Sequence, residues 1–367
     1  MTAFLIVFMA ALLGSLALVV TKDIHGHFSM DSSFGVQKIH SEATPRIGGV
    51  AIALSLILGW FVSPPSVQAL LGVMLVAGLP AFAFGLLEDI TKKVSVLHRL
   101  LATMASGVLA WYLTGIAMQN TGFAPLDWFL QFIPLAVLFT AFAVGGIANA
   151  INIIDGVNGL ASGAVAIMLC ALGLIALNVG DSTLSTVCFV VAACALGFGA
   201  VNWPMGKIFL GDGGAYLLGF LLAWLAVMLP MRNPQINAWA SLLVCLYPVL
   251  EVMFSVLRRR RREGHHPGQP DKVHMHHLIH RRIVSKIWPA ISGPMKNGMT
   301  SPICWVFVAL PATYAVMFAQ NTPMLAGAVV FFMIGYSSLY ARLSQFAWCF
   351  SAITLKHAVN EQSTINA

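Results

Sequence analysis

A cluster of histidines occupies the segment "VHMHHLIHRR" at residues 273–282: His274, His276, His277 and His280. Imidazole nitrogens ligate metal ions and form hydrogen bonds to phosphates, although a solvated basic loop is also compatible with this composition. Zinc would favour a closed set of nitrogen or sulfur ligands, and this segment has no cysteine, while the chain has no His-Glu-x-x-His motif. Arginines flank the histidines at 258–262 and 281–282, so the segment favours phosphate and nucleotide binding.

Carboxylates embedded in apolar sequence are the second set of candidates. They are Glu88 and Asp89 in "FGLLEDITKK", Asp155 in "NAINIIDGVNGLASG", Asp212 in "KIFLGDGGAYLLGF" and Glu251 in "YPVLEVMF". Ionisable groups at such depth are costly and usually line a polar cavity or pathway. All except Glu251 fall at ends of apolar runs on one membrane face, where they suit Mg²⁺, which takes one or two carboxylates together with substrate phosphates. Glu251 lies within a run, where a paired structural acid is the alternative.

Polar residues next to these acids add detail. Asn149, Asn152 and Asp155 recur every three residues and therefore share one face of a helix. The two glycines of "DGVNGL" permit a tight turn beside a ligand. The motif "LGDGG" places Asp212 at the start of an apolar run, where free backbone N–H groups favour an anion, or where the aspartate merely caps a helix.

Cations precede the second apolar run, in "VQKIHSEATPRIGGVAI". Lys38, His40 and Arg46 are candidates for holding an anionic substrate, although an ordinary cytoplasmic charge flank has the same composition.

The elements that must position these residues are membrane-spanning helices. Apolar residues make up 59% of the 367 residues and charged residues only 9%, against roughly a quarter in soluble proteins. The sequence predicts an all-α, polytopic membrane protein that forms a single domain over 1–367, with a basic cytoplasmic loop at 258–300. Eleven spans are predicted, at 2–20, 46–62, 67–87, 100–118, 129–147, 160–178, 185–201, 213–229, 237–257, 301–320 and 324–343.

The ends of the predicted spans differ in charge. Of the 20 Lys and Arg residues, all but Arg232 fall on one side of the eleven-span arrangement, and all 11 histidines do so as well. An excess of Lys and Arg marks the cytoplasmic side, so the N-terminus is predicted outside and the C-terminus in the cytoplasm. The run 2–20 lacks the basic segment and cleavage site of a signal peptide and is predicted to be retained. The six cysteines are predicted to be buried small apolar residues.

Taken in order, "KIHSEATPRIGG", "LLEDITKK", "NAINIIDGVNGL", "KIFLGDGGAYLLG" and "PDKVHMHHLIHRR" resemble the polyprenyl-phosphate N-acetylhexosamine-1-phosphate transferases. This bacterial glycosyltransferase family also contains the phospho-N-acetylmuramoyl-pentapeptide translocases. The resemblance runs from about 38 to 282. It implies an enzyme of the bacterial inner membrane that moves a sugar 1-phosphate from a UDP-sugar to undecaprenyl phosphate on the cytoplasmic face and releases UMP, with Mg²⁺ as cofactor and Mn²⁺ as a substitute.

The resemblance also assigns roles to residues. Glu88 and Asp89 match the family's paired acids, Asp155 matches its Asp-Gly acid, and Asp212 matches its Gly-Asp metal ligand. The histidine motif is matched by His274, His276 and His277. This chain departs from the pattern twice, with Glu88 for the first of two aspartates and Asn158 for the second acid of Asp-Gly-x-Asp-Gly. The spacing "HMHHLIHRR" resembles transferases of N-acetylglucosamine or another N-acetylhexosamine that start O-antigen and related polysaccharides, rather than the translocase branch.

Phosphoryl transfer between two anions is helped mainly by positioning and charge neutralisation. Mg²⁺ on Asp212, with Asp155 as a second ligand, would bridge the diphosphate. Substrate contacts are predicted for Lys38, His40, Arg46, Asn149, Asn152, Asn158 and the three histidines of the motif. Whether Glu88 or Asp89 serves as base, and whether transfer is direct or passes through an aspartyl-phosphate, stays open. Imidazolium donates two hydrogen bonds, so binding by the histidines is predicted to strengthen as pH falls through about 6.5.

A transporter is the alternative from another class. Transporters often show internal repeats or helices broken at the bilayer centre, and neither pattern is visible in this sequence. The net charge of +7 follows from the predicted topology and from attraction to anionic lipid and substrate, and gives no reason to invoke nucleic acid. A homodimer is left open by the sequence.

Overall fold

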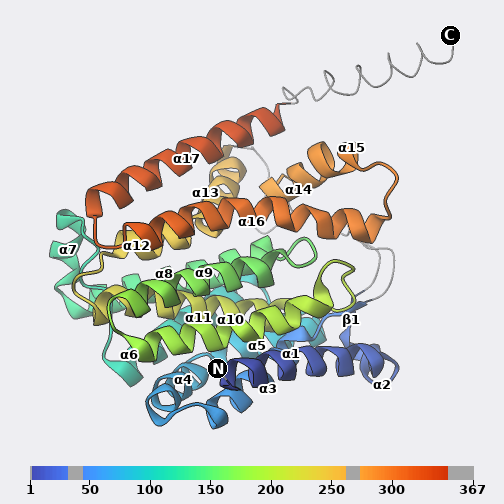
Figure 1. The fold of residues 1–367 in the computed structure, drawn as a ribbon, viewed down its shortest axis with the longest axis horizontal. Coiled ribbons are helices and arrows are strands. Elements are labelled where there is room, and N and C mark those ends of the chain that lie inside the picture. Colours follow the sequence, from blue (N-terminus) through green and yellow to red (C-terminus); the bar gives the residue numbers. More distant parts are fainter. Residues whose placement is uncertain (1, 32–43, 262–272, 346–367) are drawn as a thin grey trace.

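The computed structural model describes residues 2–31, 44–261 and 273–345, without the side chains of residue 31 and of 259–261. Lys38 and His40, for which substrate contacts are predicted, lie outside the described residues, as does Arg262. Within the described residues the chain is an assembly of roughly aligned helices (Figure 1).

Long, apolar helices make up most of the molecule. Eight are long enough to cross a membrane. They are α1 (Thr2–Val20), α6 (Val96–Thr114), α8 (Ile133–Ile154), α9 (Leu160–Asn178), α10 (Ser182–Asn202), α11 (Gly211–Arg232), α16 (Gly293–Met317) and α17 (Thr322–Ser344).

Two further spans are bent pairs of helices. The helices α4 (Pro65–Ala77) and α5 (Leu79–Thr91) meet at 48°, and α12 (Ala238–Val244) and α13 (Leu246–Arg261) meet at 74°. A proline lies in the first turn of the second helix of each pair, at Pro80 and Pro248, where it leaves no N–H to continue the preceding helix.

The predicted number of eleven spans is not confirmed, because the described helices give eight spans, or ten if each bent pair counts as one. The remaining predicted run, 46–62, contains α3 (Gly48–Val62), whose 15 residues extend about 22 Å at 1.5 Å per residue, less than the ~30 Å of a hydrocarbon core. The residues before α3 are not helical, because β2 (Thr44–Pro45) pairs with β1 (Met30–Asp31) in a small antiparallel sheet.

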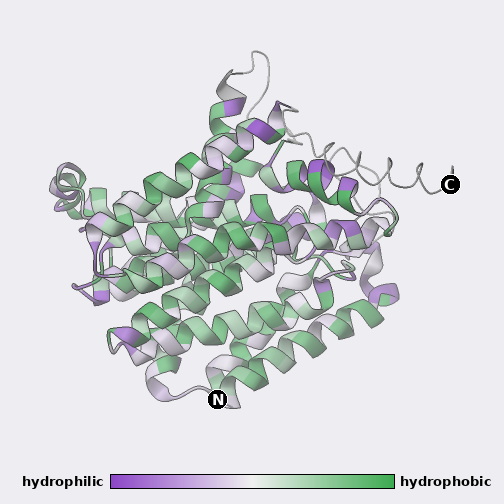
Figure 2. Cartoon of the chain, turned by 45° about the horizontal axis from the view of Figure 1, so that its top comes forward, coloured by the Kyte–Doolittle hydropathy of each residue, from purple (hydrophilic) through white to green (hydrophobic). Residues whose placement is uncertain are grey.

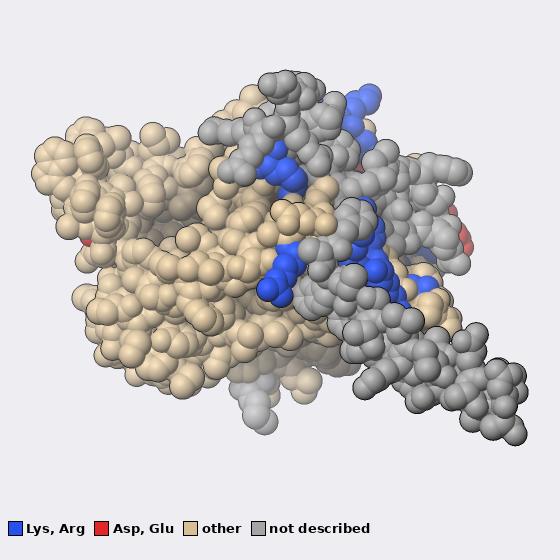
Figure 3. Space-filling view, turned by 90° about the horizontal axis from the view of Figure 1, so that it is seen from above, with Lys and Arg blue, Asp and Glu red and all other residues tan. Residues whose placement is uncertain are grey.

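Short helices connect the spans. They are α2 (Lys22–Ser29), α7 (Ala124–Leu130), α14 (Met275–Ile279), the π-helical turn η1 (His280–Val284) and α15 (Ser285–Ile287). The elements β1, α2, α14 and α15 lie at the right-hand end of Figure 1, whereas α7 and α12 lie toward the opposite end. Lys and Arg side chains gather at that same right-hand end (Figure 3), while apolar sequence dominates the middle of the helices (Figure 2).

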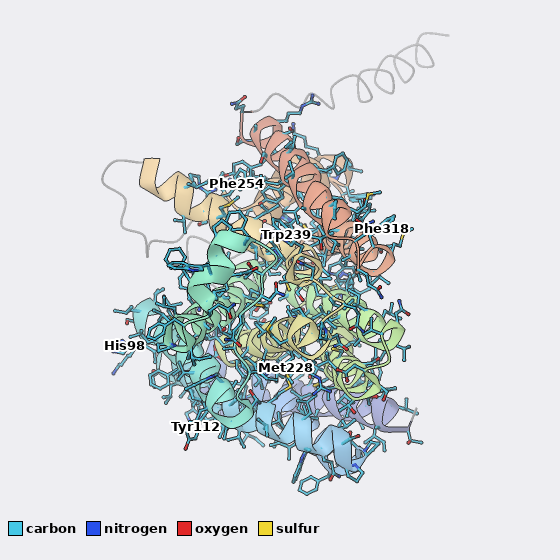
Figure 4. The ribbon with its side chains drawn as sticks, turned by 90° about the vertical axis from the view of Figure 1, so that its left-hand side faces the viewer. His98, Tyr112, Met228, Trp239, Phe254 and Phe318 are labelled. Atoms are coloured by element: carbon cyan, nitrogen blue, oxygen red, sulfur yellow. The ribbon has the colours of Figure 1, made fainter. Side chains whose placement is uncertain are left out.

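Helix α11 lies in the core of the assembly. Twenty of its 22 residues are buried, and it packs against α3, α5 and α8 as well as α9, α10 and α12. In the end-on view, Met228 of α11 lies in the middle, whereas Tyr112 and the exposed His98 lie at the edge (Figure 4). Glycines allow the close approach, because a Cβ on Gly49 would lie 2.3 Å from the backbone nitrogen of Gly214.

Candidate active site

Helix α11 carries the predicted metal ligand, Asp212, in its first turn. Gly211 adopts a left-handed φ of +74°, and a Cβ at this position would lie 2.2 Å from the carbonyl oxygen of Arg46, so the turn into the helix requires glycine. The tight turn holds Asp212 only 3% exposed. Its carboxylate is therefore placed by the packing of the whole core.

Asp89 caps α11. Its Oδ1 accepts the N–H of Asp212 and its Oδ2 accepts the N–H of Gly213, both at 2.8 Å. The Nε of Arg46 lies 3.1 Å from Oδ1 of the same carboxylate. The sequence predicted an anion at this helix N-terminus, and in the structure the protein's own Asp89 provides it.

Two guanidinium groups converge on Asp212. Arg46 donates from Nη2 to Oδ1 at 2.6 Å, and Arg99, at the start of α6, donates from Nη1 to Oδ2. Asn152 also donates to Oδ1, at 3.1 Å. Two carboxylates and two guanidinium groups therefore form one balanced cluster, to which the chain contributes residues from before α3 and from α5, α6, α8 and α11.

The asparagines of α8 do not all face this cluster. Asn152 contacts Asp212 and lies 3.4 Å from the hydroxyl of Tyr216 on α11. Asn149 turns instead toward α6, where its amide donates to the hydroxyl of Thr103 at 3.0 Å. The helical face predicted from the spacing is present, but only Asn152 contacts the carboxylate cluster.

Asp155 is the C-terminal cap residue of α8 and is partly buried. Burial raises its pKa, as do the nearby charges of Asp212 and Asp89, while Arg46 opposes them. Asp155 is therefore close enough to the cluster for these charges to act on it, and a divalent cation or a cationic partner would stabilise its charged form.

Asn158 is held by protein groups rather than facing the carboxylates. Its side chain donates to the carbonyl oxygen of Pro204 at 3.0 Å, and its backbone N–H donates to Oδ1 of Asn297 at 2.6 Å. Ser301 donates to its carbonyl oxygen at 2.6 Å. These contacts fix the turn that follows Asp155, so in this structure Asn158 serves the turn.

The histidine segment packs against the same turn. His274, His276, His277 and His280 are at most 9% exposed, which excludes the solvated loop for these residues. A Cβ on Gly156 would lie 2.5 Å from Nε2 of His276. Burial lowers the pKa of His276, His277 and His280, so these imidazoles stay neutral at pH 6.5, and the tighter binding predicted near that pH is not expected of them.

The side chain of Glu88 contacts the loop after α5, whereas that of Asp89 contacts the start of α11. Glu88 is partly exposed, and its Oε2 accepts the N–H of Val94 at 2.8 Å, which closes the turn after α5. The two adjacent acids are therefore separated by the helix: one caps α11 and the other caps its own connecting loop.

Sequence reasoning missed Arg99 and Tyr216 at the site, and also Thr103, which pairs with Asn149 outside the carboxylate cluster. Arg99 resembles an ordinary positive flank at the cytoplasmic end of a span, and the other two resemble ordinary polar residues within spans. Each of the three has its polar partner on another helix that is far away in the sequence.

The donor set fits a hard divalent cation that brings its own phosphate ligands. Among the described residues no three His, Cys, Asp or Glu side chains form a group that could hold a metal ion by themselves. Asp212 contacts the amide of Asn152, and its charge acts on the carboxyl group of Asp155. Mg²⁺ commonly uses one or two carboxylates and completes its shell with substrate phosphates and water.

Comparison with known proteins points to one family of enzymes. The family model described as Glycosyl transferase family 4 matches residues 71–230, which include Asp89, Asp155 and Asp212. An undecaprenyl-phosphate alpha-N-acetylglucosaminyl 1-phosphate transferase of Yersinia pestis is 27% identical over 77% of this chain and 73% of its own length. The protein of that name from Escherichia coli K12 is 26% identical, over 75% and 72%. A probable undecaprenyl-phosphate N-acetylglucosaminyl 1-phosphate transferase of Bacillus subtilis is 29% identical, over 66% and 67%.

Proposed function

We propose that this chain, which carries a Glycosyl transferase family 4 domain, transfers a sugar 1-phosphate from a UDP-N-acetylhexosamine to undecaprenyl phosphate and releases UMP. An oxygen of the lipid phosphate attacks the phosphorus that bears the sugar, and the bond from this phosphorus to the bridging oxygen breaks, so that UMP leaves with that oxygen. The product is a lipid-linked sugar diphosphate, the first intermediate of an O-antigen or a related cell-surface polysaccharide.

The cluster of Arg46, Arg99, Asp89 and Asp212, in which the carboxylates are buried and the guanidinium groups partly buried, is the observation that carries this proposal. Two anionic phosphates must approach each other, so the barrier is largely electrostatic and cations fixed at the site lower it. The arginines are held in place by the carboxylates before substrate arrives, so little reorganisation is required. The guanidinium groups also suit bidentate contact with phosphate oxygens.

Mg²⁺, when bound by Asp212 and Asp155, would neutralise charge on the diphosphate and orient it. Arg46 and Arg99 hold the carboxylate of Asp212 in one orientation, and Asn152 supplies a further polar contact to it. The contacts of Asn158 fix the turn beside Asp155, so both proposed ligands have defined positions.

A general base is not required in this scheme. The second pKa of a phosphate monoester is about 6, so the lipid phosphate is already largely ionised at neutral pH. Asp89 has both oxygens engaged with the N-terminus of α11, and Glu88 accepts a backbone N–H from its own loop. Their contribution is therefore to structure and charge.

An apolar cavity of about 470 Å³ offers a place for part of the polyprenyl chain. It lies between α8, α11 and α12, with Trp239 among its lining residues (Figure 4). Ile147, which lines it, precedes Asp155 by about 12 Å of helix at 1.5 Å per residue. A lipid whose phosphate lies at Asp155 and whose chain follows α8 would enter this cavity.

The test is UMP release by the purified protein in detergent. UDP-N-acetylglucosamine, undecaprenyl phosphate and Mg²⁺ should together give UMP and a lipid-linked sugar, and omission of the lipid should abolish both. A panel of UDP-sugars identifies the donor. Preference for UDP-N-acetylmuramoyl-pentapeptide would instead indicate the translocase of peptidoglycan synthesis, and the lack of any lipid-linked product from the whole panel would contradict transferase activity.

A further inference from the structure

Glu251 is a buried carboxylate for which the transfer reaction described above has no use. It lies on α13, one turn after the bend that separates α12 from α13, and is 1% exposed. The hydroxyl of Tyr247, one turn earlier on the same helix, donates to its Oε1 at 3.1 Å. A charged group at this depth is costly unless other groups compensate it.

The compensation comes from the histidine segment. Nδ1 of His274 lies 3.1 Å from Oε2 of Glu251, and the backbone N–H of Met275 donates to Oε1 at 3.1 Å. Nδ1 of His276 lies 3.9 Å from Oε1. One carboxylate thus contacts three successive residues at the start of α14 and sets the position of this helix.

The same contacts extend to the Asp155 turn. The rings of His274 and His276 are stacked with centroids 5.5 Å apart, and the ring of His276 lies against Gly156, where no side chain would fit. His277 follows, with its ring centroid 4.3 Å from that of His276. A change at Glu251 therefore reaches the Asp155 turn through the stacked imidazoles.

We propose that Glu251 is a positioning residue that fixes the tautomer of His274 and the orientation of the histidine segment toward the nucleotide part of the substrate. This inference rests on the proposed function. A carboxylate can only accept, so a neutral His274 must carry its proton on Nδ1, and its Nε2 is left as an acceptor. An acceptor of this kind suits a hydroxyl or an imide N–H, the donor groups of a uridine nucleotide.

The substitution Glu251→Gln separates positioning from structure. The single oxygen of glutamine would accept the N–H of Met275, so its amide nitrogen would face Nδ1 of His274. The amide would then donate to Nδ1, and the proton of the imidazole would move to Nε2. The variant keeps size and shape but reverses the tautomer.

The experiment measures two kinds of signal in full-length protein in detergent. We expect Glu251→Gln to lower kcat/KM for the UDP-sugar by about tenfold to 100-fold, the range for one or two buried hydrogen bonds, with KM for undecaprenyl phosphate unchanged. Selective ¹⁵N labelling of histidine should show the His274 signals exchanging their Nδ1–H pattern for an Nε2–H pattern. In a His274→Ala background, Glu251→Gln should have little further effect.

Tyr247→Phe is the matched control, because it removes another hydrogen bond to the same carboxylate without touching a histidine, and it should leave kcat/KM near the wild-type value. Glu251→Asp keeps a carboxylate that accepts from Nδ1 of His274 but shortens the arm, so the tautomer should be retained and a smaller loss is expected; loss of the Nδ1–H pattern in this variant would also contradict the proposal. The proposal would be overturned if Glu251→Gln kept the wild-type kcat/KM, if the tautomer of His274 were unchanged in it, or if the losses of Glu251→Gln and His274→Ala were additive. Absence of wild-type transfer would refute the proposed function instead, while the labelling result would still test Glu251.

Discussion

The adjacent acids Glu88 and Asp89 of α5 have different surroundings. Asp89 accepts two backbone N–H groups of α11 and an Arg46 guanidinium, whereas Glu88, among the described residues, accepts the N–H of Val94. Loss of a helix cap costs about 1–2 kcal/mol, and breaking a buried ion pair costs more. Of Glu88 and Asp89, Asp89 is therefore the residue that contributes more to stability.

Asp89→Asn should lower the melting temperature in detergent and reduce turnover strongly, because the start of α11 also positions Asp212. Glu88→Gln is the matched variant: its amide oxygen can still accept the N–H of Val94, so melting temperature and most of the turnover should be retained. Thermal unfolding and UMP release measure the two effects. A dead but stable Glu88→Gln protein would show that the charge of Glu88 takes part in the reaction.

The buried histidines make stability depend on pH. Burial lowers the pKa of His276, His277 and His280 in the folded protein, whereas an unfolded histidine titrates near 6.5. As pH falls through about 6.5, the unfolded chain binds more protons than the folded one, so the stability that is present above this pH is progressively lost.

These histidines should therefore make the melting temperature fall between about pH 7 and pH 5.5, whereas protonation of Asp155, whose pKa is raised in the folded protein, opposes the fall. His277→Asn should reduce this fall, because one buried imidazole no longer titrates. The control His98→Asn removes an exposed histidine at the edge of the bundle and should leave the fall unchanged (Figure 4). The same pH dependence of the melting temperature in the wild type and in His277→Asn would contradict the burial argument.

At the scale of elements, the packing of the described helices leaves an apolar cavity between α8, α11 and α12. The bend between α12 and α13 and the small side chains Ala143, Ala223 and Ala226 leave this space unfilled. A flexible polyprenyl chain suits an apolar space of this size, which lies within the range of ligand pockets.

Ala143→Phe should occupy part of the cavity and raise KM for undecaprenyl phosphate, with less effect on a short-chain polyprenyl phosphate and none on KM for the UDP-sugar. The control is Leu138→Phe on the same helix. Leu138 is 59% exposed, so this substitution should change none of these values. Kinetics with long and short lipids make the comparison. An equal change for both chain lengths would place the chain elsewhere.

At the scale of the whole molecule, the described helices give eight to ten spans. The direction of insertion is a prediction from the distribution of charge. Every Lys and Arg except Arg232 falls on one side of the predicted arrangement. The exception is paired, because Arg232 donates to Asp181 from both Nε and Nη2, at 2.7 and 3.0 Å. Compensation of this kind reduces the cost of a cation on the face that is predicted to be outside.

A reporter fused after Ala367 should be cytoplasmic, and one inserted in the link 119–128 should be external. Protease and alkaline-phosphatase type reporters distinguish the two sides in cells. If both positions report the same side, the inferred orientation and the parity of the spans are wrong.

The sequence by itself determined the membrane class and the helical architecture, because long apolar runs and the position of Lys and Arg are local properties. It also indicated the acids and histidines as candidate site residues, because ionisable side chains are costly within apolar, membrane-spanning sequence. It did not determine the number of spans, since the run predicted at 46–62 forms a helix only over Gly48–Val62, which is shorter than a hydrocarbon core.

Only the tertiary structure decided what each polar residue contacts. Asp89 and Asp212 meet across 123 positions of the chain, and Asn158 meets Asn297 across 139. Such pairings depend on which helices pack together and how closely their glycines allow them to approach, and no local pattern encodes this. For the same reason Arg99 resembled a charge flank in the sequence, and Glu251 resembled an isolated acid until α14 was placed against it.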